Sequence, residues 1–176
     1  MRIISGKYRG RKLSFVTTDI LRPTQDRIKE SLFNVIHKNC DKAVVLDAFA
    51  GSGSLGLEAL SRGARHVVFV DKNIDFIKKN TEWIEDQALI SIKKMSALSY
   101  LKSTSNRFDI IFLDPPWKQP DLFEHSLKAI FDFDILNMDG VIVCEHDSEH
   151  INFNQFECFK MLKFNKKNIS LLRKPK

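Results

Sequence analysis

The stretch from residue 44 to residue 60 constrains the fold of this chain more than any other segment. Residues 44–46 are apolar and include two β-branched side chains, which is typical of a buried strand. Gly51 and Gly53 follow, and after them apolar residues recur at helical spacing. Glycine permits a positive φ and a close approach of a ligand to the main chain, and a helix start presents unpaired N–H groups. The stretch therefore predicts a strand, a glycine turn and a helix that form a nucleotide-type binding corner.

A carboxylate beyond the next apolar run strengthens this interpretation. The spacing Gly51-x-Gly53-x-x-Gly56 matches the dinucleotide fingerprint, which is a weak signal when it stands alone. Asp71 ends the apolar run 66–70, where a second strand would deliver a carboxylate to ribose hydroxyls. NAD sites and S-adenosylmethionine sites share this arrangement, so these residues alone leave both cofactors open.

Apolar runs alternate with helical patterns along the chain. We expect strands near 44–47, 66–70, 89–92, 108–113 and 141–144, and helices from Thr24 to about His37, from 54 to 61, from Asn73 through Ile84, and over 96–101. Short links between such elements predict an α/β fold with a parallel, doubly wound sheet. Ligands of such sheets bind beyond the carboxyl ends of the strands. The strand-end residues expected to meet in one crevice are Asp47, Gly51, Asp71 and Asp114.

The sequence Asp114-Pro115-Pro116-Trp117 follows the fourth expected strand and predicts the chemistry. Two consecutive prolines fix φ and remove two N–H donors, so this turn presents carbonyl groups. The Asp114 carboxylate and the Pro115 carbonyl can accept both N–H bonds of an exocyclic amine, while Trp117 offers a flat wall for the heterocycle. This arrangement favours methyl transfer to the amine from a sulfonium held at the glycine turn.

Composition limits the domain count and the environment. At 176 residues with 43% hydrophobic content, the chain can form one sizeable core and a small appendage. We see no membrane span and no signal peptide, and we expect a cytoplasmic monomer. The three cysteines include no C-x-x-C pair, so we expect buried thiols. Cys144, His146 and His150 could hold a metal only on a helix, and residues 141–144 favour a strand, so no metal is expected.

The net charge of +6 lies at the ends of the chain. Residues 1–40 contain nine Lys or Arg and three acidic residues, whereas residues 41–176 contain nineteen of each. Residues 2–5 and 12–16 predict a β-hairpin with a basic tip in which Tyr8 could stack on a base. Basic ends that flank a cofactor corner favour a polyanionic substrate over a small metabolite. The candidate RNA-binding residues are Lys7, Tyr8, Arg9, Arg11, Arg22 and Arg27.

These motifs together resemble a known family. The glycine turn and Asp114-Pro115-Pro116-Trp117 are shared by many class I S-adenosylmethionine-dependent methyltransferases. The opening residues 2–13, Arg22-Pro23-Thr24 with Asp26-Arg27, and the run 46–64 more specifically resemble the RsmD family of bacterial 16S rRNA guanine-N2 methyltransferases. Trp117 stands where that family more often has Tyr or Phe, and the tail 163–170 lacks the glycine expected before the final strand.

The resemblance implies a fold, a reaction and a set of contacts. It implies a Rossmann-like, seven-stranded sheet with the last strand antiparallel, and methyl transfer to guanine N2, at position 966 of 16S rRNA, in the small subunit or its assembly intermediate. The implied catalytic residues are Asp114, Pro115, Pro116 and Trp117. The implied S-adenosylmethionine contacts are Asp47, Ala50, Gly51, Gly53, Asp71, Lys72, Ala97 and Asp114. Residues 1–40 would form an RNA-gripping appendage, and residues 41–176 the methyltransferase domain.

Four other functions compete with this interpretation. Adenine-N6 or cytosine-N4 methylation of DNA uses the same four-residue motif, but so short a chain has no room for a target-recognition domain. Methylation of a protein glutamine amide leaves the basic hairpin unexplained. An NAD-dependent oxidoreductase does not explain Asp114 to Trp117, and a non-catalytic RNA-binding module does not explain the crevice.

Overall fold

A computed structural model describes residues 1–15, 22–116, 119–147, 152–153, 155–165 and 167–175. Its elements are α1 (Arg22–Cys40), β1 (Val44–Asp47), α2 (Ser54–Ser61), β2 (His66–Asp71), α3 (Asp75–Thr81), a 3-10 turn η1 (Gln87–Leu89), β3 (Ile90–Lys94), α4 (Ala97–Ser103), β4 (Phe108–Leu113), α5 (Pro120–Asp132), β5 (Leu136–His146), β6 (Glu157–Phe164) and β7 (Lys167–Arg173).

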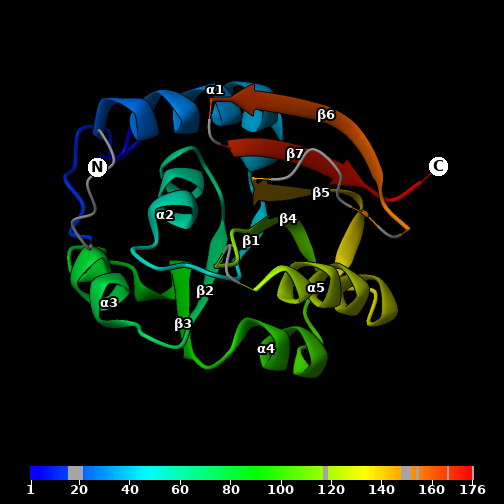
Figure 1. The fold of residues 1–176 in the computed structure, drawn as a ribbon. Helices are drawn as coiled ribbons and strands as arrows, with labels where there is room; N and C mark the ends of the chain where they lie inside the picture. Colours follow the sequence, from blue (N-terminus) through cyan, green and yellow to red (C-terminus); the bar gives the residue numbers. More distant parts are fainter. Residues whose placement is uncertain (16–21, 117–118, 148–151, 154, 166, 176) are drawn as a thin grey trace.

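One seven-stranded sheet runs through the molecule in the order β3-β2-β1-β4-β5-β7-β6 (Figure 1). The pairs among β3, β2, β1, β4 and β5 are parallel, and β7 is antiparallel to both of its neighbours. This confirms the predicted α/β fold with a mostly parallel sheet and an antiparallel last strand. Because β1 lies between β2 and β4, the carboxyl ends of these three strands lie next to one another.

Each face of the sheet is covered by its own set of helices (Figure 1). Side chains alternate between the faces, as the pleat of a strand requires. Val45 packs in one core with residues of α1, α2 and α3, whereas Leu46 packs in the other with residues of α4 and α5. The predicted apolar face of α1 does lie on the sheet, where the Phe33 and Phe112 rings are 5.8 Å apart.

Strand β4 and helix α2 have the predicted bounds, whereas helices α1 and α3 do not. Strand β4 covers the predicted 108–113, and the Ser96 hydroxyl caps α4 by accepting the Ser99 N–H at 3.1 Å. Helix α1 begins at Arg22, earlier than predicted, because Pro23 fits a first helical turn, where its missing N–H is not needed. Helix α3 ends at Thr81, so Trp83 and Ile84 lie beyond it, contrary to the prediction.

The amino-terminal segment, residues 1–15, is a tight loop rather than the predicted two-stranded hairpin. A single bridge joins Arg2 and Lys12. Strand pairing stops there because the next N–H groups, of Ile4 and Ser5, donate to the buried Glu58 carboxylate of α2 at 2.8 and 3.1 Å. Val16, the last residue of the predicted hairpin, lies outside the described residues. The loop is therefore attached to α2.

The carboxyl-terminal part contains elements whose bounds were not predicted. Helix α5 and strands β6 and β7 had no predicted bounds, and β5 extends over eleven residues where four were expected. The final hairpin turns between Phe164 and Lys167, which pair directly. Asn165 therefore occupies the turn without the glycine that the resemblance implied. In the described parts of the chain, every helix is too short or too polar to cross a bilayer.

Substitutions at two glycines of the amino-terminal loop test how this loop is attached to α2. Gly6 and Gly10 both have a φ of +85°. A Cβ at Gly6 would lie 1.8 Å from the Ser61 carbonyl oxygen, whereas at Gly10 no atom of the described residues lies within 4 Å. Both substitutions by Ala should cost about 1–2 kcal/mol of left-handed strain. Gly6→Ala should cost a further 1–3 kcal/mol, roughly, from overpacking.

Urea unfolding of Gly6→Ala and Gly10→Ala side by side measures this difference. Equal losses of unfolding free energy would show that the loop does not depend on its close contact with α2.

Candidate functional site

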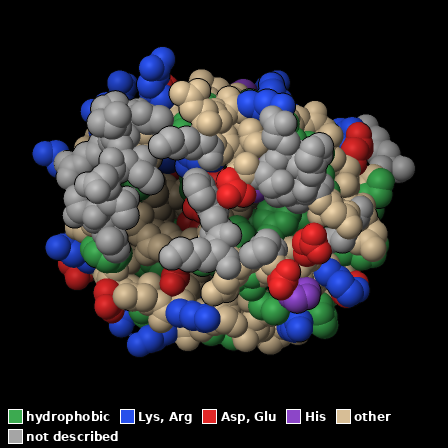
Figure 2. All heavy atoms as spheres, in the orientation of Figure 1, with side chains coloured by type: hydrophobic (Ala, Val, Ile, Leu, Met, Phe, Trp, Pro, Cys, Tyr) green, Lys and Arg blue, Asp and Glu red, His purple; other side chains and the backbone are tan. Residues whose placement is uncertain are grey.

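A cavity of about 840 Å³ lies where the strand ends meet. Figure 2 shows a hollow in this face with acidic side chains in it and Lys and Arg side chains around the outline of the molecule. Its walls come from α1, from residues 49–55 after β1, from residues 113–116 at the end of β4, and from β5 and β7. The predicted site residues in the wall are Asp47, Ala50, Gly51, Asp114, Pro115 and Pro116.

The glycine loop, residues 48–53, is held by carboxylates at two strand ends. Gly56, in the first turn of α2, donates its N–H to the Asp47 carboxylate at 2.9 Å. Gly51 donates its N–H to the Asp71 carboxylate at 2.8 Å. Gly51 and Gly53 have φ of 53° and 77°, which agrees with the positive φ predicted for the glycine turn. A Cβ at Gly51 would meet no atom of the described residues within 4 Å, so the loop leaves space beside its main chain.

Four predicted cofactor contacts lie outside the wall of the cavity. Asp71 lies behind the glycine loop, where its carboxylate also accepts the Asn73 N–H at 3.0 Å. Lys72 is exposed after β2. Ala97 starts α4 and packs in the core beneath the sheet. Gly53 is the residue that precedes α2. Their contacts with a cofactor stay predictions.

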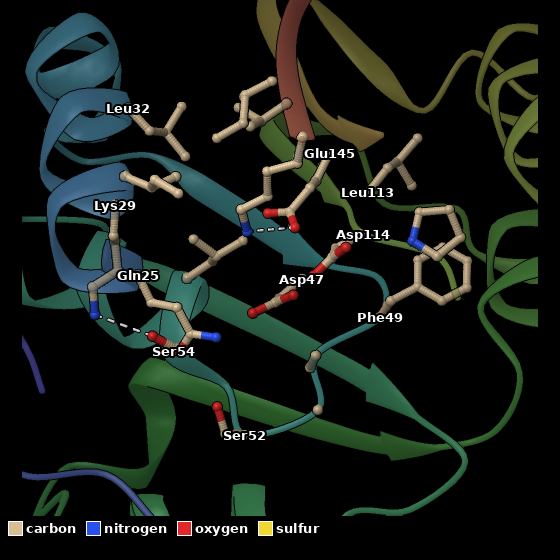
Figure 3. A pocket seen from close by; sticks show the side chains of 18 of the residues that line it. Gln25, Lys29, Leu32, Asp47, Phe49, Ser52, Ser54, Leu113, Asp114 and Glu145 are labelled. Atoms are coloured by element: carbon tan, nitrogen blue, oxygen red, sulfur yellow. Dashed lines mark hydrogen bonds and ion pairs between the residues drawn. The ribbon is translucent and has the colours of Figure 1, made fainter. Parts of the chain in front are cut away.

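The proline turn, residues 114–116, also lines the cavity. Pro115 is buried, and the Pro116 carbonyl accepts the Gln119 N–H at 2.9 Å, which leads the chain into α5. The Asp114 side chain is accessible at the cavity wall. Phe49 of the glycine loop lies on this side of the cavity (Figure 3). Trp117, the predicted flat wall, lies outside the described residues.

Three carboxylates from neighbouring strands, β1, β4 and β5, approach one another in the cavity (Figure 3). Burial raises the pKa of Asp47 to about 7, opposed by the Gly56 hydrogen bond and assisted by the charge of Asp71. The pKa of Asp114 is also raised, first because the carboxyl group loses hydration within the cavity and then because Glu145 is negative, while Lys167 opposes the shift. A cation bound between these groups would favour their ionised forms.

The cavity therefore fits a cofactor with one positive charge and a part that lies on main chain. Space beside Gly51 admits a ligand against the backbone, and the carboxylates of Asp47 and Asp114 favour the cation. A cavity of this volume is in the range of small-molecule sites. Among the described residues, no group of three or more His, Cys, Asp and Glu side chains could hold a metal ion.

Polar residues that the sequence did not indicate also line the cavity. Lys29 of α1 is 5% exposed, and its Nζ donates to the Arg2 carbonyl at 2.6 Å and to the Ser54 hydroxyl at 3.0 Å. Burial lowers the pKa of Lys29, and the nearby Glu58 opposes this shift. Glu145 and Lys167 form an ion pair at 2.6 Å in the far wall. In the sequence, Lys29 lies within the apolar pattern that predicts α1, so nothing there indicated that its side chain makes polar contacts.

The candidate RNA-binding residues lie apart from the cavity wall. The Tyr8 ring packs edge-on against Trp83 with centroids 4.7 Å apart, and the Arg11 guanidinium lies 4.1 Å from the Trp83 ring. Lys7 and Arg9 are exposed. The side chain of Arg22 is outside the described part of the structure, and Arg27 is exposed on α1. Tyr8 is therefore partly covered by the protein itself, and an RNA contact of these residues stays a prediction.

The buried Asp47 carboxyl group makes stability depend on pH. Its pKa of about 7 lies above its ordinary value of 3.8, so between these values the folded state binds an extra proton and stability falls as pH rises. Asp47→Asn keeps an oxygen for the Gly56 N–H and removes the charge. The variant should equal the parent near pH 4 and exceed it above pH 7 by up to roughly 4 kcal/mol.

Urea unfolding between pH 4 and 8 measures this difference, with the exposed residue Asp121, changed to Asn, as the control. A stability difference that is independent of pH would contradict the assignment.

Comparison with known proteins identifies the family. A family model described as Conserved hypothetical protein 95 matches residues 1–174. The chain is 43% identical over 155 residues to YlbH of Bacillus subtilis, covering 85% of this chain and 84% of that protein. It is 40% identical over 157 residues to ribosomal RNA small subunit methyltransferase D of Haemophilus influenzae, covering 85% and 80%.

The solved structure of yhhF from Escherichia coli resembles this structure with a TM-score of 0.87 at 30% sequence identity. The match covers 100% of this chain and 99% of the yhhF chain. The family model and the solved structure thus both cover nearly the whole chain, including the amino-terminal loop that the general methyltransferase motifs leave out. The chain therefore belongs to the RsmD family.

Proposed function

We propose that this chain transfers a methyl group from S-adenosylmethionine to N2 of a guanine in 16S rRNA, in the cytoplasm. The family implies position 966 of the small subunit or of its assembly intermediate. One observation carries the proposal: the glycine loop and the proline turn both line a single cavity. Family membership favours this activity over DNA methylation and over NAD-dependent oxidation.

The cofactor would lie against the glycine loop. S-adenosylmethionine supplies a sulfonium methyl group when it is bound. Gly51 leaves room for it along the main chain, and Asp71 fixes the Gly51 N–H in place behind the loop. The buried Asp47 carboxylate holds the first turn of α2 and adds negative charge to the wall that faces the sulfonium. These residues bind and orient the cofactor without themselves reacting.

The target amine would lie against the proline turn. The Asp114 carboxylate and the Pro115 carbonyl would accept the two N–H bonds of guanine N2, which turns the nitrogen lone pair toward the methyl group. Such positioning can supply up to roughly 7–11 kcal/mol of the barrier. Transfer would form the new N–C bond as the S–C bond breaks, and the alkylated nitrogen would then lose its proton to Asp114 or to water. Asp114 must be ionised, which the sulfonium favours.

Removing the Asp114 carboxylate should separate transfer from cofactor binding. Asp114→Ala should lower methyl transfer by roughly 100- to 1000-fold, the usual effect of removing one such hydrogen-bond acceptor. Affinity for S-adenosylhomocysteine should change little, because that product lacks the sulfonium charge. Asp121→Ala, an exposed carboxylate seven residues further along, is the matched control.

Mass mapping of small-subunit rRNA from cells with and without each variant reports the base, its position and the extent of methylation, and calorimetry reports cofactor affinity. Full methylation by Asp114→Ala, or a parent chain that modifies another base, would refute the proposed reaction.

The exposed cations of the amino-terminal loop should contribute to RNA affinity. Replacing Lys7, Arg9 and Arg11 by Gln should weaken rRNA binding and flatten its salt dependence, with a slope change of about one for each phosphate that is no longer neutralised. Because Arg11 stacks on Trp83, a second variant that changes only Lys7 and Arg9 separates charge from packing.

The control replaces Lys93, Lys94 and Lys102 by Gln, which removes the same charge from β3 and α4. Filter binding at several salt concentrations is the measurement. An equal decrease of slope in test and control variants would remove the amino-terminal loop from the RNA site.

A further inference from the structure

An ion pair in the cavity has no role in the reaction as described so far. Glu145 near the end of β5 and Lys167 at the start of β7 both line the cavity, with Lys167 Nζ 2.6 Å from Glu145 Oε1 (Figure 3). Their side chains are 17% and 20% exposed, respectively. Both groups have therefore lost most of their hydration, which costs free energy that a single ion pair rarely recovers.

Strand pairing alone does not explain this pair. The outer hairpin carries a comparable ion pair, Glu157 with Arg173, at the surface, where both side chains keep much of their hydration. Glu145 instead lies in the cavity beside Asp114 (Figure 3), and Glu145 and Lys167 both line the cavity close enough for their charges to act on that carboxyl group. A polar pair placed in the wall of a binding cavity is suited to a ligand.

The position of the pair indicates which ligand it meets. The glycine loop follows β1 and is held from β2, on one side of the cavity, whereas the pair belongs to β5 and β7, on the other side of β4. The proline turn at the end of β4 separates the two regions. Under the proposed function, the cofactor occupies the first region, and the target base must extend into the second.

We infer that Glu145 and Lys167 read the Watson–Crick edge of the target base and select guanine, an inference that rests on the proposed function. Along this edge guanine presents the N2 amine, the N1–H donor and the O6 acceptor, in that order. The strands β4, β5 and β7 present Asp114, Glu145 and Lys167 in the same order. The site therefore offers the Asp114 carboxylate as an acceptor for the N2 amine and the Glu145 carboxylate as an acceptor for N1–H. It offers the Lys167 ammonium as a donor to O6.

Other bases do not match this order. Adenine and cytosine carry an unprotonated ring nitrogen beside their amine, and that acceptor would face the Glu145 carboxylate. Two acceptors without a proton between them repel each other, and the buried carboxylate would also lose its hydration without compensation. Sites built to hydrogen-bond a substrate group reject analogues that lack it far more strongly than apolar pockets do.

A base analogue tests this selection. RNA with 2-aminopurine at the target position keeps the amine but has neither N1–H nor O6. The parent chain should prefer guanine to 2-aminopurine by at least about 100-fold in kcat/KM. Glu145→Gln should reduce this preference to about 10-fold or less, because the Gln amide can also donate to an unprotonated N1. Lys167→Met should slow transfer to guanine and leave transfer to 2-aminopurine nearly unchanged.

Glu157→Gln, which breaks the comparable surface pair, is the control and should keep the preference of the parent chain. A parent chain that methylates guanine, with Glu145→Gln and Lys167→Met slowing both substrates equally, would overturn the inference and leave the proposed function intact. Equal rates of the parent chain on guanine and 2-aminopurine would overturn the inference as well. A parent chain that methylates no guanine would overturn both.

Discussion

The hydrogen bond from Gly56 N–H to the Asp47 carboxylate is the constraint on which the cavity depends. It fixes α2 to the end of strand β1, so both ends of the glycine loop between them are held in place. The carboxylate is 3% exposed, and burial raises its pKa to about 7. The free protein therefore carries an unfavourable buried charge that a bound cation would stabilise. The same group thus connects the fold with cofactor affinity.

A second buried carboxylate connects the cofactor side with the outer surface. Glu58 of α2 is fully buried, accepts hydrogen bonds from the main chain of the amino-terminal loop and from Arg62 Nε at 2.8 Å, and forms an ion pair with Lys29 at 3.4 Å. Helix α2 begins at the glycine loop and carries Glu58 one turn later. The basic amino-terminal loop is therefore fixed to the helix that follows the glycine loop, although this loop and Glu58 are about 50 residues apart in sequence.

The sequence predicts what depends on burial and local chemistry. Strand β4 is apolar at nearly every position because both of its faces are covered, so its bounds were predictable. The end of α3 was not, because Trp83 continues the helical spacing but packs on Tyr8 from a turn. The proximity of Glu145 and Lys167 was also hidden. It arises because β7 inserts between β5 and β6, which local periodicity does not encode.

The cavity is acidic and the amino-terminal loop is basic. Under the proposed function, these opposite charges explain how an RNA base can enter the cavity while the RNA backbone stays outside. Exposed cations such as Lys7 and Arg9 attract phosphates to the outer surface. The carboxylates of Asp47, Asp114 and Glu145 inside the cavity repel the same phosphates. Under the proposed function, the target base must therefore leave its stack and enter alone, with its backbone held outside. On this proposal, the cations outside the cavity select for a nucleic acid, and the acceptors within the cavity select for one edge of a base.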